Sequence, residues 1–427
     1  MNIHDAMQFI HSVDWKGSVP GLSRMRRLLS MMGNPEKGMK FIHIAGTNGK
    51  GSTAAMLASV LQAAGYRTGL YTSPYIYRFN ERIRINHHEI SDPELAEITA
   101  FVKPYAESME DSPTEFELVC CIAFEYFRRM HCDIVVLEVG MGGELDATNV
   151  IEVPEAAVIT NIGLDHTDYL GATVEAIAQT KCGILKPGGR AVVYRNVPEV
   201  EAVIGRICAQ RNVSLTMADF SGIRLVSKTL EGQTFDLAAR KNLFVPLLGN
   251  HQLKNAAVTI SVIDLLRDCG WDISEENLRD GLRSVRWPGR FEVLHRDPLF
   301  IIDGGHNPQC IEALIDAVTG YLAGRRLIAL TGVLADKDFA QMFRPILSLI
   351  HQFICITPPS PRRLPACQLA EYLNAAGANA HSFDSIDEGV RAALNAASAD
   401  AVILCFGSLY SLADIRNALE SALQQRV

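Results

Sequence analysis

Short runs of apolar residues alternate with amphipathic stretches along nearly the whole chain. Strands that alternate with helices of ordinary length are typical of a parallel, doubly wound sheet. In the first two thirds of the chain we predict strands at 40–45, 68–72, 133–139, 156–161 and 190–194. Helices are predicted at 53–64, 94–105, 115–130, 174–185 and 253–269.

The pattern changes twice after residue 217. Over 217–247 the apolar runs are shorter and the turns more polar, which indicates a small antiparallel sheet. A boundary is predicted near 287–294, and a second alternating series follows, with strands at 299–303, 327–331, 352–356 and 401–406. We therefore predict two α/β domains, residues 1–293 and 294–427.

Composition narrows the class of protein. The chain has 427 residues, 48% of them hydrophobic, and a formal net charge of −8 without a long basic run, which argues against a nucleic-acid partner. No apolar stretch reaches the length needed to cross a bilayer, and the first residues lack the pattern of a secretion signal. The ten cysteines show no Cys-x-x-Cys spacing, and several stand in apolar runs, where buried reduced thiols are expected. These features predict a cytoplasmic protein.

A glycine-rich loop with a lysine follows the strand at 40–45. Its sequence, Gly-Thr-Asn-Gly-Lys-Gly-Ser, covers 46–52 and leads directly into a predicted helix. Backbone N–H groups, the lysine charge and the helix N-terminus together suit a nucleotide phosphate, although a tight turn without ligand is the alternative. The loop differs from the common phosphate-binding pattern, because Gly51 stands where a hydroxyl usually binds Mg²⁺. Ser52, Thr72 and Ser73 are the nearby hydroxyls that could replace it.

Two more predicted strands end in or lead to a residue of a type that can bind metals. Glu138 closes the strand at 133–139, at the edge of the sheet where ligands bind, although such an acid could simply accept hydrogen bonds from the backbone. His166 stands between Asp165 and Asp168 after the next strand and fits a metal or phosphate site, although a single histidine is more often structural. The loop at 145–149 could line a substrate pocket.

Several polar residues farther along the chain stand in sequence patterns that are less specific for a binding site. Lys181 lies on or beside the apolar face of its helix, where it needs a partner unless its ammonium reaches solvent, which is the default expectation. Arg290 lies on the predicted linker and could reach a phosphate. Asp303 and His306 follow a second-domain strand, and amide side chains at 249–255 open a helix.

Together these segments resemble the folylpolyglutamate synthase and dihydrofolate synthase family, within the Mur ligase superfamily. The matching motifs occur in the family's order and span nearly the whole chain, at 46–52, 71–74, 78–82, 137–143, 164–167, 251–255, 288–292 and 303–308. The resemblance implies a P-loop-type domain with a mostly parallel sheet, followed by a smaller Rossmann-like α/β domain. It also implies an ATP-dependent ligase that adds L-glutamate to a reduced folate through an acyl phosphate.

The resemblance also implies roles for individual residues. ATP would be held by Gly49, Lys50, Gly51, Ser52, Asn255, Arg290 and Asp303, with His306 completing the site. One Mg²⁺ would be bound by Ser73 and Glu138 and a second by His166, and Lys181 would be carbamylated. Lys50, Lys181 and His306 would be catalytic. Folate would contact Arg82, Thr114, Glu115, Phe116, Glu117, Leu145, Asp146 and Ala147.

The motifs leave some alternatives open. Glu115 stands where many relatives have an aromatic residue, so we expect folylpolyglutamate synthesis and leave the use of dihydropteroate open. A peptidoglycan-precursor ligase is the alternative, but only residues 1–40 precede the loop strand, too few for a uridine-nucleotide domain. A non-catalytic ATP switch would not need Glu138, His166, Lys181 and Arg290 together. We expect a monomer without membrane or nucleic-acid partners.

Overall fold

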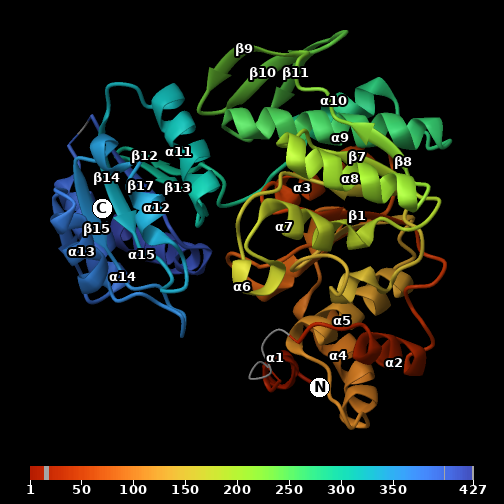
Figure 1. The fold of residues 1–427 in the computed structure, drawn as a ribbon. Coiled ribbons are helices and arrows are strands. Elements are labelled where there is room, and N and C mark those ends of the chain that lie inside the picture. Colours follow the sequence, from red (N-terminus) through yellow and green to blue (C-terminus); the bar gives the residue numbers. More distant parts are fainter. Residues whose placement is uncertain (14–18, 399, 426–427) are drawn as a thin grey trace. The chain divides into compact units, whose positions relative to one another are not determined.

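A computed structural model describes residues 1–13, 19–398 and 400–425 (Figure 1). The chain forms two compact units. The first comprises Met1–Arg224, Phe235–Phe244 and Leu253–Val285, and the second comprises Leu225–Thr234, Val245–Gln252 and Arg286–Val427. The second unit thus takes in two short stretches that precede the predicted linker. No helix of the described ranges is long and apolar enough to cross a membrane.

The first unit is built on an eight-stranded sheet with the order β4-β3-β2-β5-β1-β6-β7-β8. Across the sheet, β2, β5, β1, β6, β7 and β8 pair in parallel with their neighbours. Strands β3 and β4 form an antiparallel edge beside β2. The strands are β1 (Phe41–Ala45), β2 (Thr68–Tyr71), β3 (Ile83–Ile85), β4 (His88–Glu89), β5 (Ile134–Glu138), β6 (Ala156–Ile159), β7 (Arg190–Val193) and β8 (Ser214–Met217). All five strands predicted for this part are confirmed, whereas β3, β4 and β8, at the two edges of the sheet, are additional to the prediction.

Ten α-helices belong wholly or mainly to the described part of this unit. They are α1 (Ile3–His11), α2 (Ser23–Met31), α3 (Lys50–Ala63), α4 (Asp92–Glu107), α5 (Glu115–Arg129), α6 (Thr167–Leu170), α7 (Val174–Lys181), α8 (Pro198–Gln210), α9 (Asn250–Asp268) and α10 (Glu275–Ser284). Three 3-10 turns that matter below are η2 (Phe79–Arg82), η3 (Ala147–Val150) and η4 (Cys182–Ile184). The predicted helix 174–185 is therefore shorter, and its last turn tightens into η4.

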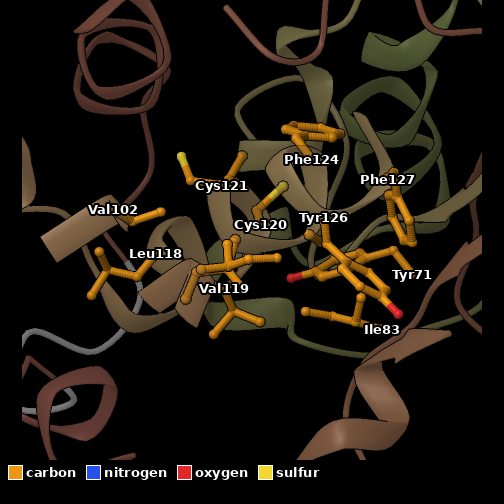
Figure 2. Close-up of a cluster of buried hydrophobic side chains, with 14 of the residues drawn as sticks. Tyr71, Ile83, Val102, Leu118, Val119, Cys120, Cys121, Phe124, Tyr126 and Phe127 are labelled. Carbon is orange, nitrogen blue, oxygen red and sulfur yellow. The ribbon is translucent and has the colours of Figure 1, made fainter. Parts of the chain in front are cut away.

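One hydrophobic core of the first unit is formed with α1, α2, α4 and α5, which pack against one another (Figure 1). Figure 2 shows this cluster, in which Tyr71 of β2, Ile83 of β3 and Val102 of α4 lie with side chains of α5, among them Leu118, Val119, Cys120, Cys121, Phe124, Tyr126 and Phe127. Helix α5 is buried almost all round, which explains its nearly continuous apolar sequence. Its position fixes Thr114 and Phe116, at its start, against the sheet.

Helix α3 is also buried on several sides. It contacts β1, β2, β5 and α10, and all its residues from Ser52 to Leu61 are buried. Gly281 of α10 makes the close approach possible, because a Cβ there would lie 2.3 Å from the Cα of Val60. This packing holds the helix that begins at the glycine-rich loop.

The second unit contains a six-stranded sheet with the order β12-β13-β17-β14-β15-β16. Only the β12–β13 pairing is antiparallel. Its strands are β12 (Glu292–Arg296), β13 (Leu299–Ile302), β14 (Arg326–Thr331), β15 (Gln352–Cys355), β16 (Ala380–Ser382) and β17 (Ala401–Phe406). Its helices are α11 (Pro308–Tyr321), α12 (Phe339–Phe343), α13 (Ala366–Ala375), α14 (Ile386–Ala396) and α15 (Leu412–Gln424). The four predicted strands are confirmed, and so is the two-domain α/β class.

The excursion predicted over 217–247 is a three-stranded sheet with the order β11-β10-β9. Its strands are β9 (Ile223–Thr229), β10 (Gly232–Leu237) and β11 (Arg240–Val245). Connections of two residues can join only antiparallel neighbours, so the predicted antiparallel arrangement is confirmed.

Replacing Gly281 tests the close packing of α10 on α3. We expect Gly281→Ala to lower the free energy of unfolding by about 1–3 kcal/mol, because the added methyl group forces the two backbones apart. The matched control is Gly205→Ala in α8, where a Cβ would meet no atom within 4 Å. That change should stabilise the protein by about 0.5–1 kcal/mol, since alanine favours the helix. Urea denaturation followed by circular dichroism measures both; equal effects would contradict the packing argument.

Candidate functional site

The glycine-rich loop is shaped by two glycines that no other residue could replace without displacement. Gly46 and Gly49 have φ values of 154° and 85°, and a Cβ on Gly46 would lie 1.8 Å from the hydroxyl of Thr160. A Cβ on Gly49 would lie 2.6 Å from Oδ1 of Asn255. Gly49 caps α3, so the N–H groups of its first turn point out of the helix at this loop instead of toward earlier helical carbonyls. The structure thus brings Asn255 to the loop, as the resemblance implies.

The two lysines predicted to be catalytic meet at one carbonyl group. Nζ of Lys50 donates to the carbonyl oxygens of Gly46 and Thr47 at 3.1 and 3.2 Å. Nζ of Lys181 donates to the same Gly46 oxygen at 2.8 Å. Lys181 is only 4% exposed, so the default expectation that its ammonium reaches solvent is wrong. The Gly46 carbonyl gives the buried amine a partner that the sequence did not reveal.

The environment of Lys181 disfavours its charged form. Burial lowers the pKa of Lys181 to about 7, and the neighbouring charge of Lys50 acts in the same direction. Asp165 and Asp146 oppose this shift by stabilising the ammonium. A substantial fraction of the Lys181 amine is therefore neutral at physiological pH, unlike that of an ordinary lysine.

The predicted metal ligands Ser73 and Glu138 are adjacent. The backbone N–H of Ser73 donates to Oε2 of Glu138 at 3.2 Å, because β2 and β5 pair in parallel and end side by side. A serine hydroxyl and a carboxylate are the hard oxygen donors that Mg²⁺ prefers, so this pair fits the ion. Glu138 also pairs in register with Ile44 of β1, so its strand end is next to the glycine-rich loop.

His166 lies on the neighbouring strand connection. It is exposed, has a φ of 51° and caps α6. The loop that carries it is tied to the glycine-rich loop, because Thr47 exchanges hydrogen bonds with Gly163 at 3.0 and 3.1 Å. No group of three or more His, Cys, Asp or Glu side chains forms a metal centre among the described residues, so His166 does not join Glu138 in such a cluster.

The residues predicted to contact folate divide into three groups, of which the first is Thr114 and Glu117. Thr114 and Glu117 form a capping box at the start of α5, and Glu117 pairs with Arg24 at 3.1 Å. These two side chains are therefore engaged in holding the helix start. The Thr-x-x-Glu spacing is itself the sequence signal for such a cap.

The second group forms an aromatic and charged cluster. The ring of Phe116 lies against Gly140, where a Cβ would be 2.5 Å away, and 6.0 Å from the ring of Tyr71. The Arg82 guanidinium lies 5.6 Å from the Phe116 ring and pairs with Glu115 at 3.5 Å. Nε of Arg82 is buried and has no hydrogen-bond partner in the structure.

The loop that follows Glu138 carries the remaining predicted folate contacts. Leu145 is 52% exposed, whereas Asp146 and Ala147 are buried. Burial raises the pKa of Asp146, and hydrogen bonds from Thr148, Met141 and Gly140 oppose that shift. Asp146 is thus a carboxylate fixed by its own loop.

In the second unit, Arg290, Asp303 and His306 come together at the end of β13. Asp303 accepts hydrogen bonds from the N–H groups of Gly305 and Phe291 at 2.7 and 2.9 Å. Burial raises its pKa, and the charge of Arg290 opposes the shift. A Cβ on Gly304 would lie 2.3 Å from Nη1 of Arg290, and Nδ1 of His306 is 2.8 Å from the Gly304 carbonyl oxygen.

Two family models match the chain. The Mur ligase middle domain matches residues 44–263, and the Mur ligase glutamate ligase domain matches residues 289–409. Among similar proteins, a folylpolyglutamate synthase of Lacticaseibacillus casei is 36% identical over 98% of this chain and 99% of its own length. A dihydrofolate synthase/folylpolyglutamate synthase of Bacillus subtilis is also 36% identical, over 97% of this chain and 99% of its own length.

Solved structures agree with these relatives. Escherichia coli FolC in complex with DHPP and ADP has a TM-score of 0.87 and 31% identity, covering 100% of this chain and 99% of that one. An FPGS–AMPPCP–folate complex has a TM-score of 0.84 and 35% identity, with the same coverage. These similarities favour the folate enzymes over the peptidoglycan-precursor alternative. The chain belongs to the folylpolyglutamate synthase and dihydrofolate synthase family of the Mur ligase superfamily.

Proposed function

We propose that this protein uses ATP to join L-glutamate to the carboxylate of a reduced folate, and that it also accepts dihydropteroate. The observation that carries the proposal is the convergence of Lys50, Lys181 and the Ser73–Glu138 pair around one glycine-rich loop. Relatives named for both reactions and structures with ADP, AMPPCP and folate support it.

The chemistry requires activation of the folate carboxylate, which is a poor electrophile while its oxygen cannot leave. Transfer of the γ-phosphoryl group from ATP to a carboxylate oxygen gives an acyl phosphate and ADP. The glutamate amine then attacks the acyl carbon, loses a proton, and phosphate leaves from the tetrahedral intermediate. Since phosphoryl transfer depends mainly on positioning and charge neutralisation, no protein nucleophile is required.

Lys50 is positioned to change partners when ATP binds. In this structure its ammonium donates to two loop carbonyls, which are weaker partners than a phosphate. We propose that Lys50 turns to the phosphates while the N–H groups at the start of α3 bind the same anion. Gly49, Gly51 and Ser52 contribute through the backbone, and Asn255 supports the loop from the side. Arg290, Asp303 and His306, which cluster in the second unit, are proposed to bind nucleotide as the resemblance implies.

Ser73 and Glu138 are proposed to hold Mg²⁺, which would neutralise phosphate charge when bound, and His166 is proposed to bind a second ion. Lys181 is proposed to react with carbon dioxide. Its neutral amine forms a bond to the carbon and releases a proton, which gives a carbamate anion. The product would attract Lys50 instead of repelling it, and its oxygens suit a metal.

Acceptance of dihydropteroate is compatible with Glu115. This side chain pairs with Arg82 and, at 3.0 Å, with His11, so the carboxylate is engaged. The next residue, Phe116, supplies the aromatic ring beside Gly140. Monomeric state and cytoplasmic location stay predictions.

Product formation tests the proposed function. We expect radiolabelled glutamate to enter product with tetrahydrofolate and with dihydropteroate when ATP and Mg²⁺ are present, with one ADP formed per glutamate added. Label with tetrahydrofolate alone would restrict the activity to folylpolyglutamate synthesis. Folded protein that binds AMPPCP yet labels neither substrate would overturn the ligase proposal.

Lys50→Ala tests the phosphate-binding role. Because a charge-assisted contact to the transferred group is lost, we expect kcat to fall by about a hundredfold or more, with little change in melting temperature. Lys254→Ala is the control, since it removes a lysine of α9 near Asn255 that has no proposed role. Near-normal turnover by the Lys50 variant would remove this residue from the mechanism.

Carbamylation of Lys181 has a spectroscopic test. We expect ¹³C-bicarbonate to give a carbamate resonance that strengthens as pH rises through about 7, where the Lys181 amine loses its proton. Lys181→Ala should abolish both the resonance and turnover, and added short carboxylates should partly restore turnover. No resonance in the wild type and no rescue of the variant would indicate an ordinary lysine.

A further inference from the structure

A buried imidazole outside the proposed chemistry lies next to the folate loop. His43 is in the middle of β1, three residues before Gly46, and its side chain is fully buried. Its Nε2 lies 2.9 Å from Oγ1 of Thr148 in η3. The Thr148 hydroxyl, also fully buried, lies 2.5 Å from Oδ1 of Asp146. A chain of hydrogen bonds therefore joins the strand that carries the glycine-rich loop to a predicted folate contact.

The direction of each hydrogen bond follows from the available protons. The Asp146 carboxylate already accepts from the N–H groups of Met141 and Thr148 at 2.9 and 3.0 Å, so it is an acceptor. The single proton of the Thr148 hydroxyl is donated to Asp146. Nε2 of His43 must then donate to the Thr148 oxygen, which requires the neutral tautomer with its proton on Nε2.

The surroundings of His43 agree with that tautomer. Nδ1 is buried and has no hydrogen-bond partner in the structure, so a proton placed there would have no acceptor. Burial lowers the pKa of His43 to about 3, and the charge of Lys186 contributes in the same direction. Lys186 is held nearby by a 2.9 Å hydrogen bond to the carbonyl oxygen of Asn149. His43 therefore acts as a fixed neutral donor rather than as a proton carrier.

Asp146, the last residue in this chain of hydrogen bonds, holds the conformation of the loop after β5. Oδ2 of Asp146 binds the N–H of Met141, and the N–H of Asp146 donates to the Gly143 carbonyl at 3.3 Å. Together these bonds close the loop from Gly140 to Asp146. Gly140 in turn lies against the Phe116 ring, so a rotated Asp146 would disturb both the carboxylate and the aromatic contact.

We propose that His43 is a positioning residue for the folate or dihydropteroate substrate, acting through Thr148 on Asp146. The inference rests on the proposed function, since it assigns a role to the same substrate loop. Loss of the Nε2 donor frees the Thr148 hydroxyl to turn away, and Asp146 then loses one of its fixed hydrogen bonds. The effect should fall on the pterin-bearing substrate and spare the nucleotide.

Nuclear magnetic resonance tests the tautomer without any assay of turnover. In ¹⁵N-histidine-labelled wild type, we expect one ring with its proton on Nε2 and no titration between about pH 5.5 and 8, unlike an ordinary histidine. Its signals are assigned by their loss in His43→Gln. A His43 ring that carries its proton on Nδ1, or that becomes charged in this range, would overturn the inference.

Paired variants test the role in binding. His43→Leu and Thr148→Val remove the relay, whereas His43→Gln and Thr148→Ser keep a donor or hydroxyl of similar reach. We expect the first pair to raise KM for dihydropteroate about tenfold, the scale of one lost buried hydrogen bond, with KM for ATP within about twofold of wild type. The second pair should restore most of the affinity.

The outcomes separate this inference from the proposed function. The positioning role alone is wrong if the wild type is active but His43→Leu and Thr148→Val keep a normal KM for dihydropteroate. It is also wrong if these two variants lose as much affinity for ATP as for dihydropteroate. A folded wild type that forms no product would defeat the proposed function instead. If His43→Leu does not fold, the Thr148→Val and Thr148→Ser pair decides the question, since Val has nearly the volume of Thr without the hydroxyl, and Ser keeps the hydroxyl while losing one methyl group.

Discussion

Two ammonium groups that share the carbonyl oxygen of Gly46 are the feature on which the rest of the site depends. Lys50 and Lys181 approach the same acceptor at 3.1 and 2.8 Å, one half-buried and the other almost fully buried. Their mutual repulsion in a poorly solvated place is unfavourable. An anion near Lys50, or loss of the Lys181 charge, relieves it. The charges at this loop are therefore consistent with the proposed phosphate near Lys50 and with a neutral or modified Lys181.

The sheet explains why these groups can meet. Strands β2, β5, β1 and β6 are neighbours and run in parallel, so the connections that follow them emerge at one edge. Ser73, Gly46 and His166 follow β2, β1 and β6, and Glu138 is the last residue of β5. Burial of α3 and α5 fixes the sheet from its two faces. Hydrogen bonding between the paired strands thus holds residues that are far apart in the sequence close together at this edge of the sheet.

Much of this arrangement could be predicted from the sequence. Alternating apolar runs predicted the central strands of both sheets but not β3, β4, β8, β12 and β16, and motif order indicated the family, because both signals are local. The burial of Lys181 could not be predicted, since its partner is a backbone carbonyl 135 positions away. Thr114 and Glu117, predicted as folate contacts, form the capping box of α5, and their Thr-x-x-Glu spacing is a local signal for that cap. His43 and Thr148 gave only a weak signal, a polar residue within an apolar strand, because their contact joins distant segments.

The central claim is that this site activates a folate carboxylate by phosphorylation. Transfer of ¹⁸O tests it most directly: the substrate carboxylate is labelled in both oxygens, and the phosphate released with product is examined by mass spectrometry. The account predicts one ¹⁸O atom in each phosphate, because the acyl phosphate carries a carboxylate oxygen to phosphorus. Phosphate without ¹⁸O, or label that appears in AMP, would contradict it.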